Sequence, residues 1–182
     1  MTTTETGTPT LSGERADLLD TLGKHRFFLR NTTRNLTEEQ AAASPTASAL
    51  CLGGLIKHVA HGEKQWVNFI LEGASAMASD GKDWADWDES DYAEYTQAFQ
   101  MQPGETLAGV LADYQRVARR TDELIATLDL DASHPLPKAP WFEPGVSWSA
   151  RRVLMHIVAE TAQHAGHADI IRETLDGAKS MG

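Results

Sequence analysis

The feature that most restricts the fold of this sequence is a helical spacing of apolar residues in four long segments. Leucine, valine, isoleucine and aromatic residues recur every three or four positions, as they do along the buried face of an amphipathic helix. The four segments are residues 14–34, 48–71, 106–128 and 147–177. No stretch shows a convincing two-residue alternation of strand type. The sequence therefore predicts an all-α protein built as a four-helix bundle.

The links between these segments are longer than the turns of an up-and-down bundle. Thr37, with Gln40 three residues later, predicts the start of one short helical turn. Residues 131–146 contain four prolines and predict a loop. Residues 74–103 lack a regular period and predict a long, acidic crossover between the second and third helices. We expect it to be solvated and pinned to the bundle by aromatic side chains, although so long a connection often lines a site. Those aromatic residues are Trp84, Trp87, Tyr92 and Tyr95.

Composition places the chain among globular proteins and excludes several classes of partner. Its 182 residues are enough for one domain, which we expect over residues 11–182, with a disordered tail over residues 1–10. A formal net charge of −10 argues against nucleic acid, because phosphate binding depends on lysine and arginine. The lack of any run of about 18 apolar residues argues against a membrane protein. One cysteine and no signal-peptide pattern predict a cytoplasmic location.

Four side chains able to bind a metal gather in the last helical segment. His156, Glu160, His164 and His167 follow one another at spacings of four, four and three residues. This places them within a sector of roughly 80° on one helix. The apolar stripe of the segment predicts that Glu160 and His164 face the core, with His156 and His167 at its edge. A buried carboxylate and imidazole must be paired or bind a cation. A divalent metal ion and an ordinary Glu–His hydrogen bond both satisfy this condition.

The second helical segment supplies a third candidate ligand. Its apolar stripe places His58 at the border of the core and His61 further toward water. His58, Glu160 and His164 would then form a His/Glu/His set drawn from two helices. Three protein ligands with one open position are typical of a catalytic zinc site. The same donors accept nickel, iron or manganese, so we expect a divalent metal cofactor, zinc in the first place.

Two blocks of sequence contain these candidates, LGGLIKHVAHGEKQW at residues 52–66 and WSARRVLMHIVAETAQHAGHADIIRE at residues 148–173. Together they resemble the DinB-like superfamily of four-helix-bundle metalloenzymes, and the likeness extends over nearly the full length. The resemblance implies a metal bound by His58 and by two residues a turn apart on the last helix. Many members have histidine at both of those places, whereas this chain has Glu160 at the first. That variant is similar to the thiol-dependent branch, which includes mycothiol S-transferases and mycothiol-dependent maleylpyruvate isomerase.

The resemblance also implies an activity. A low-molecular-weight thiol such as mycothiol would be activated as a metal-bound thiolate and would attack a small electrophile, as in detoxification. The sequence shows no counterpart of the isomerase's C-terminal domain, so we expect a transferase rather than an isomerase. The alternatives are a thiol-independent metal hydrolase on the same scaffold and a non-enzymatic metal-binding module. In such a module the histidine face would serve packing or a homodimer.

Three further polar residues of the last segment have both a functional and a structural interpretation. His156 and His167 could hydrogen-bond the metal ligands or shuttle a proton, or they could be surface histidines without a role. Arg172 could meet a substrate carboxylate. A surface ion pair between Arg172 and its neighbour Glu173 or Asp169 is the simpler expectation, and such a pair contributes little stability.

Overall fold

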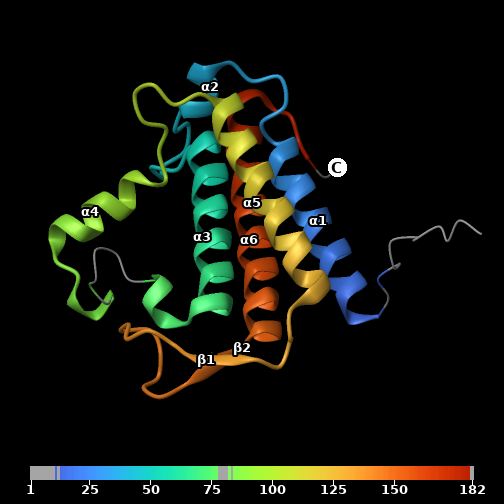
Figure 1. Cartoon of the computed structure of the whole chain (residues 1–182). Helices are drawn as coiled ribbons and strands as arrows, with labels where there is room; N and C mark the ends of the chain where they lie inside the picture. Colours follow the sequence, from blue (N-terminus) through green and yellow to red (C-terminus); the bar gives the residue numbers. More distant parts are fainter. Residues whose placement is uncertain (1–10, 12, 78–81, 83, 181–182) are drawn as a thin grey trace, which may run out of the picture.

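Four long helices form the body of the molecule (Figure 1). The computed structural model describes residue 11, residues 13–77, residue 82 and residues 84–180, so the tail predicted at residues 1–10 lies outside it. The long helices are α1 (Glu14–Asn31), α3 (Leu52–Glu72), α5 (Leu107–Thr127) and α6 (Ala150–Asp176). Helix α6 packs against α1 and α3, and helix α5 packs against the same two helices. The predicted all-α fold with a four-helix bundle is therefore confirmed.

The ends of the long helices follow from local capping. The hydroxyl of Ser149 accepts a hydrogen bond from a backbone N–H three residues on and caps α6, as predicted. Gly73 and Gly177 end α3 and α6 with a φ of 79°, a conformation that glycine adopts without steric cost. Helix α3 begins later than predicted, because Cys51 rather than Ser48 caps it. Within the described residues, no helix is long and apolar enough to cross a membrane.

The chain turns sharply after the first long helix. Helix α1 stops at Asn31, earlier than predicted, and the hydroxyl of Thr32 donates a hydrogen bond back to a carbonyl of its last turn. Helix α2 (Glu38–Ala42) follows. Thr37 and Gln40 form a reciprocal capping box at its N-terminus, which confirms the predicted short turn.

The crossover between α3 and α5 contains helical structure that the sequence did not predict. Its described residues, 74–77, 82 and 84–103, hold two short 3-10 helices and one α-helix, namely η1 (Ala74–Met77), η2 (Trp84–Asp86) and α4 (Glu89–Gln97). Helix α4 has no buried residue, and a capping box between Asp88 and Asp91 begins it. The expectation of an irregular crossover is wrong over these residues. A helix formed by end capping, without a buried face, leaves no apolar stripe in the sequence.

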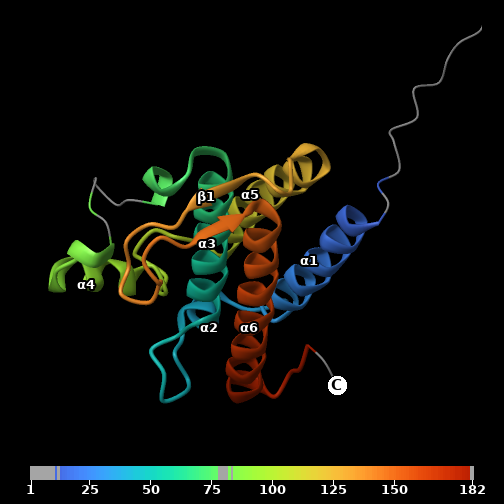
Figure 2. The ribbon, with the colours of Figure 1, turned by 90° about the horizontal axis from the view of Figure 1, so that it is seen from below.

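A small sheet closes one end of the bundle (Figure 2). Its two antiparallel strands are β1 (Ser133–Pro135) and β2 (Ser147–Ser149). The sequence predicted a loop at β1 and the start of the last helical segment at β2, because strands of three residues are too short to show an alternation. Both views place α4 and the loop between β1 and β2 on the same side of the bundle, beside α3. The backbone N–H of Ala85 donates to the carbonyl oxygen of Lys138 at 3.2 Å and joins the two segments.

Two apolar clusters fill the bundle, with a buried polar group between them. Leu22, Trp66, Ile125 and Ile157 belong to the cluster next to the sheet, and Leu29, Val59, Tyr114 and Ala168 belong to the other. Between the clusters, Nε of Arg26 donates to Glu63 at 3.2 Å, and the Thr121 hydroxyl donates to the same carboxylate at 2.5 Å. Arg26 and Glu63 are 4% and 2% exposed. This ion pair joins α1 and α3 across the bundle.

Candidate metal centre

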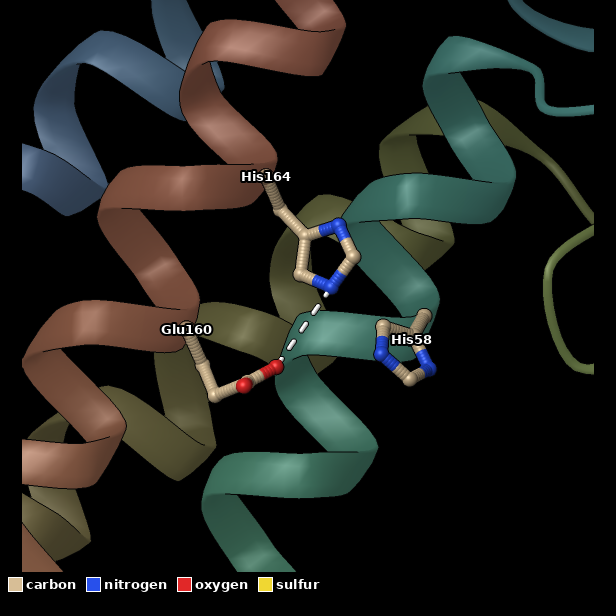
Figure 3. Close-up of side chains that lie close together, drawn as sticks. All are labelled: His58, Glu160 and His164. Atoms are coloured by element: carbon tan, nitrogen blue, oxygen red, sulfur yellow. Dashed lines mark ion pairs between the residues drawn. The ribbon is translucent and has the colours of Figure 1, made fainter.

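Three predicted ligands converge from two helices (Figure 3). His58 projects from α3, and Glu160 and His164 project from successive turns of α6. One ligand atom of each residue lies within 4.8 Å of the others. Nε2 of His164 is 3.6 Å from Oε2 of Glu160. The helical spacing brings the two α6 residues together, and the packing of α3 against α6 adds the third.

The donor set and its spacing fit a divalent cation. Two ligand atoms that are each about 2.1 Å from a tetrahedral ion lie roughly 3.4 Å apart, which is close to the separation of the Glu160 and His164 atoms. That separation is longer than an N–H···O hydrogen bond. Nδ1 of His58 and Nδ1 of His164 are buried without a hydrogen-bond partner among the described residues. Two imidazoles and one carboxylate suit zinc, nickel, iron or manganese.

The protonation states of His58 and Glu160 also suit a cation. Burial, together with a smaller contribution from the nearby His164, lowers the pKa of His58 to about 4. Its ring is therefore neutral near neutral pH and has a free electron pair. The His164 imidazole is the main cause that holds the pKa of Glu160 below its usual value, so this carboxyl is ionised. A neutral imidazole beside an ionised carboxylate is the state in which both can act as ligands.

Glu160 lies in a different environment from the one predicted. The sequence placed it toward the core, but its side chain is 42% exposed, compared with 12% for His164. The buried face of α6 is rotated away from it and includes Thr161 and Ala165. These small residues were not part of the apolar stripe from which the orientation was predicted. Glu160 therefore stands in the wall of a cavity instead of in the core.

A cavity of about 1000 Å³ opens on the candidate ligands. His58, Glu160 and His164 all line it, so a cation held by them would be accessible from it. Its wall is built by α3, the crossover, the loop between β1 and β2, and α6. The aromatic residues of this wall are Trp66, Trp84, Trp87, Tyr92, Tyr95, Trp141 and Phe142. The expectation that aromatic residues pin the crossover to the bundle is confirmed by the contact of the Tyr95 ring with the His58 ring of α3, at a centroid distance of 6.2 Å.

The end of the crossover is seated on two glycines of α3. A Cβ atom at Gly54 would lie 1.7 Å from the carbonyl oxygen of Phe99, so the backbones meet where no larger residue fits. Nζ of Lys57 donates to the carbonyl oxygen of Gln100 at 3.1 Å. This seating stacks the Phe99 ring on His58 with a centroid distance of 3.9 Å. Sequence reasoning missed this contact, although adjacent glycines inside a helical segment are a signal of close backbone approach.

The remaining histidines fall into two groups. His156 lines the cavity and contacts the stacked rings of Trp66 and Trp148. Its Nε2 atom is 4.0 Å from Oε1 of Glu160, and burial lowers its pKa. His167 is exposed, and its ring centroid is 5.5 Å from that of His164. It is not among the described residues that line the cavity. His61 is exposed, as predicted, and it lies at the wall of the same cavity as His156.

Arg172 has neither of the predicted roles. It is 6% exposed, and its guanidinium donates to the backbone carbonyls of Thr32 and Arg34 at 2.7 and 2.8 Å. Its ion pair is with Asp176, not with Glu173 or Asp169. The guanidinium thereby satisfies carbonyls just after the end of α1 and ties that end to α6. Asp176, one turn further along α6, gives this arginine a local partner, so no sequence signal marks its contacts with the distant carbonyls, which only the fold supplied.

The comparison with known proteins agrees with this geometry. The family model described as mycothiol-S-transferase matches residues 17–177, a span from α1 to the residue that ends α6. No curated protein matches the chain. The matched span includes all three candidate ligands and the whole crossover. With most of its length matched, the chain belongs to the mycothiol S-transferase family.

Proposed function

We propose that this chain catalyses a metal-dependent transfer of mycothiol to an electrophile. Membership of the family supports the transferase activity and the choice of mycothiol as the thiol substrate. The observation that carries the metal dependence is the convergence of His58, Glu160 and His164, whose ligand atoms lie within 4.8 Å of one another at the cavity wall. Two imidazoles and one carboxylate leave a coordination position open to a substrate.

The metal has a chemical task in this proposal. A free thiol has a pKa of about 8.5, so it is mostly protonated and weakly nucleophilic near neutral pH. A divalent cation, zinc in the first place and otherwise nickel, iron or manganese, would stabilise the sulfur as a thiolate. An electrophile in the cavity would then be attacked by that sulfur, and detoxification is the role that we propose for the reaction.

The residues around the ligands have supporting tasks. Neutral His58 offers its electron pair, and the stacked Phe99 ring keeps the imidazole in place. His156, 4.0 Å from the second oxygen of Glu160, is proposed as a positioning residue that orients this carboxylate. His167 lies on the exposed side of His164. We propose a positioning role for His167 as well, through the His164 ring.

A comparison of metal content with thiol transfer tests the proposal. The untagged protein is purified, its metal is measured by elemental analysis, and mycothiol consumption is followed with 1-chloro-2,4-dinitrobenzene. Wild-type protein should hold close to one equivalent of metal, whereas His164→Ala should lose at least about tenfold in metal affinity and in rate. His25→Ala, on α1, is the matched control and should keep both. Equal thiol consumption by wild type and His164→Ala, or turnover of an ester without thiol, would overturn the proposal.

A further inference from the structure

Aromatic rings form a continuous wall around the candidate metal centre, in two arms that meet at Trp84. The first arm belongs to the crossover. The ring centroids of Trp84 and Trp87 are 6.4 Å apart, and those of Trp87 and Tyr95 are 5.6 Å apart. Tyr95 in turn contacts the His58 ring at 6.2 Å. This arm therefore runs from Trp84 to a ligand on α3.

The second arm reaches the other ligand helix. Trp84 lies 6.1 Å from Phe142, Phe142 lies 6.4 Å from Trp66, and Trp66 lies 4.7 Å from His156, measured between ring centroids. His156 is the neighbour of Glu160. All these rings line the same cavity. A flat molecule held in this cavity can therefore contact aromatic rings of both arms.

The uncompensated charge of the cavity wall is negative. Lys57 is the one cationic side chain among the described residues that line it, and Nζ of Lys57 is already bound by Glu105 at 2.8 Å. Four carboxyl groups line the same cavity, those of Glu63, Asp91, Glu94 and Glu160. Glu63 is paired with Arg26, and Asp91 is paired with Lys82. The wall therefore offers no uncommitted cation to an anionic substrate, and it keeps the negative charge of Glu94.

We infer that the electrophile of this enzyme is an uncharged molecule with a planar aromatic ring, and that anionic electrophiles are rejected. The inference rests on the proposed function. Aromatic side chains attract a planar ring through stacked and edge contacts. A carboxylate placed between them would lose its hydration without gaining a cation. It would also approach a carboxylate-bearing wall and a negatively charged sulfur. Both effects disfavour an anionic electrophile in this cavity. Neither effect disfavours an uncharged aromatic ring.

Two aryl halides that differ by one carboxylate test the inference. In both reactions the sulfur forms a bond to the ring carbon that carries chlorine, the carbon–chlorine bond breaks, chloride leaves, and the thiol proton passes to the buffer. The probes are 1-chloro-2,6-dinitrobenzene and 4-chloro-3,5-dinitrobenzoate, each with mycothiol, and each rate is divided by its uncatalysed rate. We expect kcat/KM, corrected in this way, to be at least about tenfold higher for the uncharged probe.

Two variants separate the aromatic and the charge contributions. Trp84→Ala should raise KM for the uncharged probe severalfold and leave KM for mycothiol nearly unchanged. Glu94→Lys, at an exposed position of α4, should raise kcat/KM for the anionic probe. The ratio of kcat/KM between the uncharged and the anionic probe should therefore fall. Glu123→Lys makes the same charge change on an exposed part of α5 outside the described cavity wall and should keep the wild-type preference.

The outcomes are distinguishable. If both probes react equally well, or if Glu94→Lys does not change their ratio, the inference is overturned while the proposed transferase function stands. If neither probe consumes mycothiol above the uncatalysed rate, the proposed function fails and the inference fails with it. A preference for the uncharged probe that Glu94→Lys narrows and Glu123→Lys does not would support the inference.

Discussion

Replacing Gly54 by alanine should displace the crossover from α3. The added Cβ would lie 1.7 Å from the carbonyl oxygen of Phe99 and 2.3 Å from its carbonyl carbon. To reach an ordinary contact of about 3.5 Å, one of the two backbones must move by roughly 2 Å. Such a shift breaks the stacking of Phe99 on His58 and the hydrogen bond from Lys57 to the crossover.

The expected change in the free energy of unfolding is the sum of three contributions. Overpacking of a tight contact costs about 1–3 kcal/mol, and the lost hydrogen bond costs about 1 kcal/mol. The better helix propensity of alanine returns about 1 kcal/mol. We therefore expect the free energy of unfolding to fall by about 1–3 kcal/mol, measured by urea denaturation with circular dichroism. Thiol transfer should fall with it, because Phe99 no longer holds the His58 ring.

Two other glycines serve as graded controls. Gly53 faces the flexible side chain of Met101, whose Sδ would be 2.5 Å from a new Cβ, so Gly53→Ala should destabilise less than Gly54→Ala. Gly23 lies on an exposed part of α1 with nothing within 4 Å, and Gly23→Ala should stabilise by about 0.5–1 kcal/mol. If Gly54→Ala were as stable and active as wild type, the close seating of the crossover would be wrong.

Three further predictions concern buried polar groups, and urea unfolding checks each of them. Arg26→Leu leaves the Glu63 carboxylate buried without its partner and should lower the free energy of unfolding by about 3–5 kcal/mol. The double variant Arg26→Leu/Glu63→Leu should recover most of that loss, and no recovery would contradict the ion-pair explanation. In metal-free protein, the pKa of His58 is lowered from 6.5 to about 4. The unfolded chain therefore binds the proton more readily, so the contribution of His58 to stability is present above pH 6.5 and is lost as the pH falls toward 4. His58→Phe should weaken this pH dependence, and an unchanged slope would refute the assignment. Arg172→Ala should cost about 1–3 kcal/mol, because it leaves buried carbonyls after α1 without a donor. A neutral effect would show that water replaces the guanidinium.

Much of the fold could be read from local patterns in the chain. Helix periods and caps are local properties, so Gly177 and the Thr37–Gln40 capping box were predicted at their observed positions, and Ser149 was one of two candidate caps, with Ser147. For the same reason the sequence predicted that Glu160 and His164 share one side of α6, since residues four apart always face the same side of a helix. Helix α4 was missed because it has no buried face, and the three-residue strands were missed because they are too short for a pattern.

The surroundings of the candidate site depended on contacts between distant segments. Glu160 was expected in the core, yet the rotation of α6 against its neighbours placed it in the cavity wall. Arg172 was expected at the surface, yet it is buried against the end of α1. The pairing of Phe99 with His58 joins residues of α3 and the crossover that no periodicity relates.

The sequence by itself determined where the long helices lie and which side chains share a face, because helix geometry repeats every few residues and the chain carries that period directly. It also indicated His58, Glu160 and His164 as a ligand set. Only the tertiary structure decided that these three side chains meet at a cavity, and that Trp84, Phe142 and Trp66 wall it. These relations join residues far apart in the chain, and they depend on which helices pack together and how each is rotated when the core closes.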